Sequence, residues 1–178
     1  NTGLEQARGR YLIFLDSDDW FEPDFLARMV GRAEETGADV TICRAVEFDT
    51  HTGKELPSEW MLKTAFLPTE MVFSPGDVAV HLFQFTYGCP WVKLYRTDFV
   101  QENRLTYPSL PNSEDLVFVF QSLAVAGKVS VLEQVLVHHR VNRKTSVSNS
   151  LGRNPDVPAK ALFTLRDCLK QRGLYEQY

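Results

Sequence analysis

Three carboxylates follow an apolar run near the start of the chain. Asp16, Asp18 and Asp19 come directly after Tyr11–Leu15, a run that predicts a strand buried on both faces. In open α/β sheets, ligands bind at the carboxyl ends of strands, where these side chains are expected to lie. The Asp-x-Asp spacing suits a hard divalent cation such as Mg²⁺, whose shell phosphate oxygens and water can complete. The segment therefore predicts a metal site that faces a phosphate-bearing ligand.

Other interpretations of these carboxylates were weighed against the metal site. A polar turn after a strand needs one aspartate rather than three. A strand ending in Asp-x-Asp also opens the haloacid dehalogenase-type phosphatases, but no convincing pair of a lysine and a second aspartate follows downstream. An EF-hand loop requires glycine at its sixth position, where Phe21 stands. The metal–phosphate interpretation is therefore preferred.

A second pair of carboxylates, Glu114 and Asp115, follows Ser113 at the start of an apolar helix that is expected to end at Ala126. Acidic residues stabilise a helix N-terminus by about 0.3–1 kcal/mol, and on the residues alone this explanation is preferred. The alternative is a general base that accepts a proton from a substrate. A helix N-terminus lowers the pKa of a carboxyl group, so Asp115 is expected to be ionised at pH 7.

Strands and helices alternate along the chain, which predicts an α/β fold. Pro23 and Gly37 mark the ends of one helix, and Ser74 with Pro75 starts another that runs to about residue 85. Further helices are expected after Thr97, over 113–126 and over 157–172. Strands are expected at 11–15, 38–48 and 129–141 and within 88–96, with loops at 104–113 and 142–155.

The composition is that of a soluble globular domain. The 178 residues suffice for one hydrophobic core, and the net charge of −4 argues against a nucleic-acid partner. No apolar run approaches the roughly 20 residues that span a bilayer, and no signal peptide is evident. Three cysteines far apart in the sequence are expected to be reduced thiols, so a cytoplasmic location is predicted.

Four segments follow one another in a characteristic order: residues 1–23 with Asp16-x-Asp18, then Gly88–Arg96, Glu114–Asp115, and Arg140 with Ser146-x-Ser148. This order resembles that of family 2 glycosyltransferases, which transfer a sugar from a nucleotide-sugar with inversion. The resemblance implies an α/β, GT-A-like mixed sheet flanked by helices. It covers residues 1–150, which we expect to form the metal- and acceptor-side part of that domain, followed by a C-terminal helical segment at 151–178.

The resemblance implies a donor site at the first carboxylate cluster. Asp18 is expected to bind Mg²⁺ or Mn²⁺ directly, and Asp16 to bind the ribose or make a second metal contact. Asp19 fits either role, and His139 is a further candidate metal ligand. Contacts to the donor diphosphate are expected from Asp16, Asp18 and Asp19 together with residues of a later segment, namely Arg140, Ser146 and Ser148.

The acceptor side is implied by the remaining segments. Trp91 and Lys93 are expected to line it, and aromatic faces such as that of Trp91 stack on sugars. The resemblance also reverses the preference at the second carboxylate pair. Asp115 is the expected general base, and Glu114 is expected to support its geometry or to bind the acceptor.

Family 2 enzymes begin with strands that bind the nucleobase, and nothing of this kind precedes Asn1. We therefore expect an N-terminally truncated fragment, with an exposed sheet edge through which two copies could pair. A UDP-sugar is the expected donor, and a saccharide or lipid-linked saccharide is the expected acceptor. Bacterial surface-polysaccharide synthesis at the inner face of the membrane, with peripheral membrane association, is implied by family analogy. The competing hypothesis is an inactive fragment or pseudoenzyme that acts as a binding or assembly module.

Overall fold

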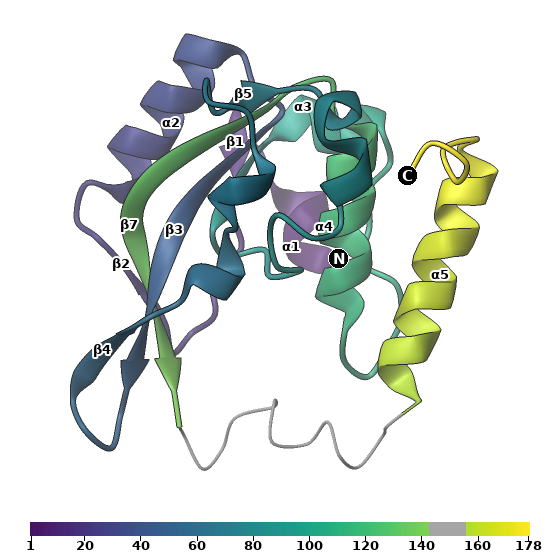
Figure 1. The fold of residues 1–178 in the computed structure, drawn as a ribbon. Coiled ribbons are helices and arrows are strands. Elements are labelled where there is room, and N and C mark those ends of the chain that lie inside the picture. The colour runs from purple at the N-terminus through teal and green to yellow at the C-terminus, as the bar shows by residue number, and fades with distance from the viewer. Residues whose placement is uncertain (143–155) are drawn as a thin grey trace.

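A seven-stranded mixed sheet runs through the described residues, 1–142 and 156–178, of the computed structural model (Figure 1). Its main path has the order β1-β6-β3-β7-β2, with β4 paired to β3 and β5 paired to β7. β3 and β7 are parallel, and the other pairs are antiparallel. The strands are β1 (Tyr11–Leu12), β2 (Trp20–Phe21), β3 (Val40–Asp49), β4 (Lys54–Pro57), β5 (Val72–Phe73), β6 (Lys93–Arg96) and β7 (Val129–Val141).

Helices cover both faces of this sheet, with α2 on one side and α4 and α5 on the other (Figure 1). This arrangement confirms the predicted α/β, GT-A-like architecture. The α-helices are α1 (Thr2–Gln6), α2 (Phe25–Thr36), α3 (Thr97–Glu102), α4 (Glu114–Val125) and α5 (Val157–Gln171). Three 3₁₀ helices lie between β4 and β6: η1 (Glu59–Met61), η2 (Thr64–Phe66) and η3 (Pro75–His81).

The parallel β3–β7 pair forms the centre of the sheet. Its register runs from Val40 opposite Val129 to Asp49 opposite Val141, with an irregularity around Arg44. Val40 is fully buried, as expected for a β-branched residue between two helical layers. The strands predicted at 38–48 and 129–141 are therefore confirmed.

The C-terminal helix α5 packs on α4. It buries Leu165 and Leu169, and Arg172 Nη2 donates a hydrogen bond to the Asn103 carbonyl at 2.7 Å. Residues 156–178 therefore share one core with residues 1–142. The predicted boundary at 150/151 lies outside the described residues.

Three local predictions were wrong. β1 contains only Tyr11–Leu12, which are half-buried at the sheet edge because β6 is the single strand that pairs with it; Leu15 is 47% exposed. α2 begins at Phe25, because Pro23 and Asp24 form the turn that leads into it. The segment after the predicted start at Ser74 and Pro75 has a capping box between Ser74 and Asp77, but it forms a kinked 3₁₀ helix that ends at His81 rather than an α-helix that runs to about residue 85.

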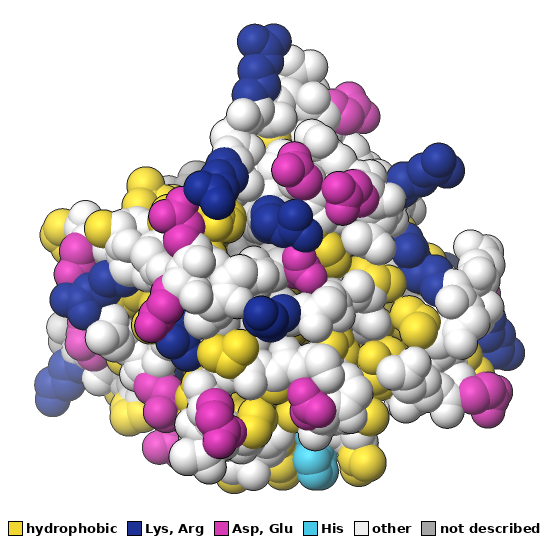
Figure 2. All heavy atoms as spheres, turned by 90° about the horizontal axis from the view of Figure 1, so that it is seen from above, with side chains coloured by type: hydrophobic (Ala, Val, Ile, Leu, Met, Phe, Trp, Pro, Cys, Tyr) yellow, Lys and Arg dark blue, Asp and Glu magenta, His cyan; other side chains and the backbone are white. Residues whose placement is uncertain are grey.

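The surface carries charges of both signs. Figure 2 shows acidic and basic side chains interspersed over the face seen from above. Among the described residues, no helix combines the length and apolarity needed to cross a bilayer. The dimer through an exposed sheet edge stays a prediction, as does peripheral membrane association.

Asp39 joins three elements at the start of β3. One carboxylate oxygen accepts a 2.6 Å hydrogen bond from Arg96 Nη2 of β6, and the other accepts one of 2.7 Å from the Gly127 N–H and one of 3.3 Å from the Lys128 N–H. The turn between α4 and β7 is thereby attached to the sheet. This carboxylate satisfies backbone donors that would otherwise lose their partners.

Replacing Asp39 by alanine should lower the free energy of unfolding by about 2–3 kcal/mol, because two backbone N–H groups and a guanidinium lose their acceptor. Urea unfolding followed by circular dichroism measures this loss. Asp24→Ala is the matched control, because Asp24 lies in the exposed turn before α2, where its side chain pairs with Arg28 and makes no capping hydrogen bond, so stability should change by less than about 0.5 kcal/mol. Equal effects of the two substitutions would contradict the role assigned to Asp39.

Candidate functional site

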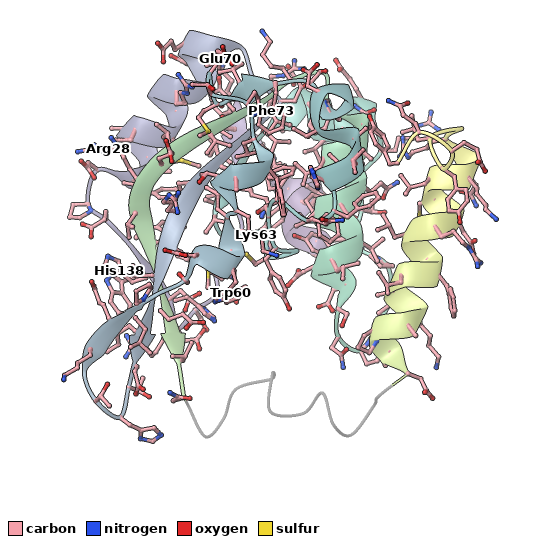
Figure 3. The ribbon with its side chains drawn as sticks, in the orientation of Figure 1. Arg28, Trp60, Lys63, Glu70, Phe73 and His138 are labelled. Carbon is pink, nitrogen blue, oxygen red and sulfur yellow. The ribbon has the colours of Figure 1, made fainter. Side chains whose placement is uncertain are left out.

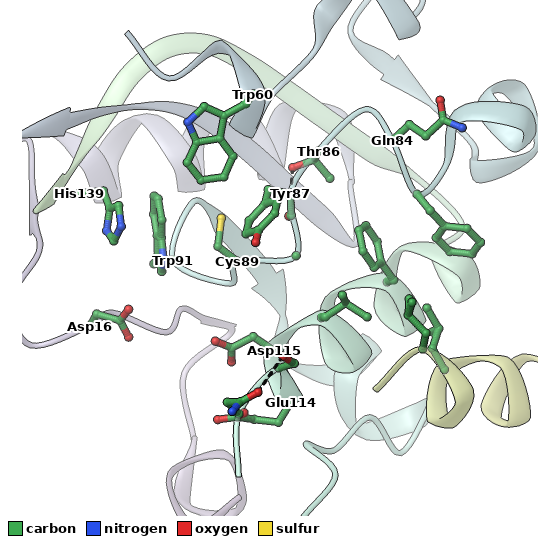
Figure 4. Close-up of a pocket in the computed structure, with 18 of the residues that line it drawn as sticks. Asp16, Trp60, Gln84, Thr86, Tyr87, Cys89, Trp91, Glu114, Asp115 and His139 are labelled. Carbon is green, nitrogen blue, oxygen red and sulfur yellow. Dashed lines mark hydrogen bonds between the residues drawn. The ribbon is translucent and has the colours of Figure 1, made fainter. Parts of the chain in front are cut away.

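A cavity of about 730 Å³ opens between the loop after β1, the N-terminus of α4 and the segment that precedes β6. Asp16, His139, Glu114 and Asp115 line it together, although they come from three separate parts of the chain. Figure 4 shows Asp16 and His139 at one end, the two residues of α4 in the middle, and α5 beyond them. The structure therefore brings both predicted carboxylate sites to one cavity.

The loop after β1 is tied to β7 by reciprocal hydrogen bonds. The Asp19 side chain is fully buried and accepts hydrogen bonds from the Arg140 N–H at 2.9 Å and from His139 Nδ1 at 2.9 Å. In return, Arg140 Nε donates to the Asp18 carbonyl at 2.9 Å. Asp19 thus anchors the loop and does not line the cavity, and its expected metal or ribose contact stays a prediction.

Asp16 is the member of the cluster that reaches the cavity. Its pKa is raised, first by partial burial and then by the negative charges of Asp19 and Asp18. The His139 side chain opposes this effect. The charges of Asp18 and Asp19 therefore act on Asp16 at short range, and a cation bound beside Asp16 would offset this repulsion.

Asp115 lies in the first turn of α4, which Ser113 opens in a left-handed conformation with φ of 62°. Burial raises the pKa of Asp115 to about 6, with further contributions from the charges of Glu114 and Asp16, while Lys93 lowers it. The expected lowering of this pKa by the helix N-terminus was wrong in direction. The cause is that burial and two neighbouring carboxylates outweigh the helix dipole.

Lys93 lies beneath the cavity rather than on its surface. Its side chain is fully buried, and Nζ donates hydrogen bonds to the carbonyls of Tyr87 and Cys89 at 2.9 and 2.8 Å. Burial lowers the pKa of Lys93. Lys93 thus does not line the cavity and supports the wall that the Tyr87–Cys89 segment forms, and its acceptor contact stays a prediction.

Trp91 does line the cavity, but it is only 4% exposed, and its ring stacks on that of His139 with centroids 4.8 Å apart. Arg140 does not line the cavity. Its guanidinium lies over the rings of Trp20 and Phe48, at 5.0 and 5.9 Å from their centroids. Its described contacts hold the loop after β1 and do not reach into the cavity. Ser146 and Ser148 lie outside the described residues.

The segment from 59 to 87 contributes side chains that the sequence analysis did not identify. Trp60, Lys63, Gln84 and Tyr87 all line the cavity. Figure 3 shows Trp60 and Lys63 close together, at η1 and just after it. Residues 54–73 have no clear periodicity, so no pattern marked these side chains in advance. The sequence signal for this wall is limited to an aromatic and a cationic residue, Trp60 and Lys63, three positions apart in an irregular segment.

A divalent cation fits the donor end of the cavity. Within residues 1–142 and 156–178, no three His, Cys, Asp or Glu side chains are grouped so that they could hold a metal ion by themselves. Mg²⁺ usually takes only one or two protein carboxylates together with substrate phosphates. The raised pKa of Asp16, caused in part by Asp18 and Asp19, is consistent with such a partly built site.

The fold and the position of these carboxylates define a GT-A-type enzyme domain, in which an acidic loop after a sheet strand faces an acidic helix N-terminus. Residues 1–104 match the family model described as Glycosyl transferase family 2, and the chain belongs to this family. The match includes the acidic loop and ends before Asp115.

Curated relatives agree with this assignment. The putative glycosyltransferase EpsH of Bacillus subtilis (strain 168) is 35% identical over 153 residues, which are 83% of this chain and 42% of that protein. The poly(ribitol-phosphate) beta-N-acetylglucosaminyltransferase TarS of Staphylococcus aureus (strain MW2) is 24% identical, over 88% of this chain and 25% of that protein. The chain therefore spans less than half the length of these relatives.

Solved structures show the same fold. The crystal structure of S. aureus TarS 1-349 in complex with UDP-GlcNAc superposes with a TM-score of 0.73 and 20% identity, over 95% of this chain and 45% of that chain. The structure of the same protein in complex with UDP gives a TM-score of 0.67. These likenesses confirm the predicted architecture.

Gly88 gives a test of the cavity geometry, because a Cβ there would lie only 3.0 Å from the Leu116 Cα atom of α4. Gly88→Ala should displace the N-terminus of α4, including Asp115, and lower glycosyl transfer by roughly tenfold to a hundredfold. Steady-state assays of the full-length protein measure the loss.

Gly31→Ala is the control, because no atom lies within 4 Å of its added Cβ and the exposed helix gains helix propensity. Full activity of Gly88→Ala would show that the contact between Gly88 and Leu116 does not position the base.

Proposed function

We propose that the protein containing this chain transfers a sugar from a nucleotide-sugar, with UDP as the nucleotide, to a hydroxyl group of a saccharide acceptor during polysaccharide assembly. The observation that carries this proposal is the convergence of Asp16 and Asp115 on one cavity, where the negative charge of Asp16 contributes to the raised pKa of Asp115. The relatives' names and the UDP-GlcNAc complex of TarS support the donor class.

Asp115 is proposed as the general base of an inverting displacement. Its carboxylate takes the proton of the acceptor hydroxyl as that oxygen attacks C1 of the donor sugar. The bond between C1 and the phosphate oxygen breaks on the opposite face, and the nucleoside diphosphate leaves. A carboxylate with a pKa of about 6 is more basic than an ordinary aspartate, yet it remains mostly ionised at pH 7.

Asp16 and Asp18 are proposed as the residues that bind the donor diphosphate through a metal ion. Together they would hold Mg²⁺ or Mn²⁺, which when bound neutralises the charge of the leaving diphosphate. Asp19 and Arg140 keep the loop in place through their contacts with β7. His139, whose Nδ1 is occupied by Asp19, has its other ring nitrogen as a candidate ligand.

The pH dependence of transfer should report Asp115. The base works only when ionised, so kcat/KM should fall as the pH is lowered through about 6 and should be level above it. Asp115→Asn removes the base and should lower the rate by about 10²- to 10⁴-fold at every pH. Radiolabelled or coupled assays of the full-length protein measure both quantities.

Folding serves as the control in this experiment. The raised pKa means that ionised Asp115 destabilises the fold as the pH rises from about 4 to above 6, since the folded state binds the proton more tightly. Asp115→Asn should therefore be at least as stable as the parent protein at pH 7. A variant that folds and still transfers sugar at the parent's rate would refute the assignment of the base.

The metal site predicts that UDP binds more tightly in the presence of Mn²⁺ than in EDTA. Asp18→Ala should remove most of this difference, because one of the two proposed ligands is lost. Isothermal titration of the full-length protein with UDP measures it, and Asp24→Ala serves as the control carboxylate away from the cavity. Equal UDP affinity with and without the metal would exclude this role of Asp16 and Asp18.

A further inference from the structure

Two aromatic side chains stand exposed at the cavity. Trp60 is 39% exposed and Tyr87 is 56% exposed, and their rings meet edge to face with centroids 4.7 Å apart. They come from segments separated by η2, β5 and η3, yet they line the same cavity as Asp115. We call this pair the aromatic corner.

The backbone beneath the aromatic corner is held in place. The Met61 carbonyl accepts hydrogen bonds from the Tyr87 N–H at 3.1 Å and from Thr86 Oγ1 at 3.0 Å. Next along the chain, the Lys63 N–H donates to the Phe85 carbonyl at 2.7 Å. Large exposed aromatic side chains therefore project from a fixed base, which lowers the ordering cost of binding.

Lys93 adds a third restraint from below. Its buried ammonium group binds the Tyr87 carbonyl at 2.9 Å and so fixes the residue that carries one ring of the corner. A buried ammonium group is costly unless it is hydrogen-bonded, and the two carbonyls that it binds belong to the segment that carries Tyr87. The corner is thus a built feature of the cavity wall rather than a chance exposure.

Trp91 cannot offer an open ring face to a sugar in the way the sequence suggests. It is 4% exposed, and His139 covers one of its faces. Trp60 and Tyr87 instead present ring surface to the cavity, and Lys63, three residues after Trp60, lines the same cavity. Apolar ring faces with an ammonium group nearby suit a ligand with an apolar face and a rim of hydroxyl groups.

We infer that Trp60 and Tyr87 bind the acceptor saccharide, by contact with the C–H face of a pyranose ring whose hydroxyl groups face the polar side chains of the cavity wall, such as Lys63. This inference rests on the proposed function. In Figure 4 the corner lies above Asp115, so a sugar between them could present a hydroxyl to the proposed base. A nucleobase is the competing occupant that the test must separate.

Saturation-transfer NMR of the full-length protein tests this inference with methyl glycosides of β-glucose, β-galactose, β-N-acetylglucosamine and α-mannose. At least one should bind, with the strongest saturation at the protons of one C–H face. Trp60→Ala and Tyr87→Ala should each weaken that binding by about three- to tenfold, which is the range expected for an aromatic contact. UDP affinity should stay unchanged in both variants.

Tyr175→Ala is the matched control, because Tyr175 is 42% exposed and contacts Lys170 but does not line the cavity. It should bind the glycoside as the parent does. The inference is overturned if no glycoside shows saturation, if neither corner variant weakens binding, or if UDP affinity falls in the variants, which would assign the corner to the nucleobase. If UDP binding to the parent protein does not depend on the metal, that result counts against the proposed function and not against the aromatic corner.

Discussion

A single buried ammonium group connects the sheet to the wall of the cavity. Lys93 belongs to β6, and its Nζ binds the carbonyls of Tyr87 and Cys89, so the chain that precedes the strand folds back over it. The same positive charge lowers the pKa of Asp115 and so opposes the carboxylates that raise it. Burying an ammonium group costs free energy because it loses its hydration, and hydrogen bonds to the two carbonyls only partly offset that cost. One side chain therefore supports the shape of the wall and also contributes to the pKa of Asp115.

A buried carboxylate has the corresponding role on the donor side. The Asp19 carboxylate accepts hydrogen bonds from the Arg140 N–H and from His139 Nδ1. These contacts hold the loop against β7, while Asp16 lines the cavity. The division of roles among the three aspartates follows from their positions, because only one of them can face the central strand and be covered by it. Asp16 and Asp19, three positions apart, thus differ in burial and in the groups that they contact.

The sequence predicted the parts of the fold that depend on local pattern. The apolar periodicity around Met29 and the αL glycine at position 37 located α2, and the apolar run after Asp115 located α4. Burial depends on neighbours that are distant in the chain, so it was predicted less well. The direction of the pKa shift of Asp115, the depth of Lys93 and the short strand at Trp20–Phe21 all depend on such contacts. The cavity residues Trp60 and Tyr87 were missed for the same reason.

The packing of α5 on α4 has a consequence for how such a cavity can diversify. Leu162 and Leu165 of α5 line the cavity, whereas the acidic loop lies far earlier in the chain, inside the region that matches the family model. A substitution on this helix can reshape one wall while leaving the acidic loop and its attachment to β7 unchanged. The chain thus encodes the two sides of the cavity in separate stretches of sequence, a modular arrangement in which one side can vary while the other is kept.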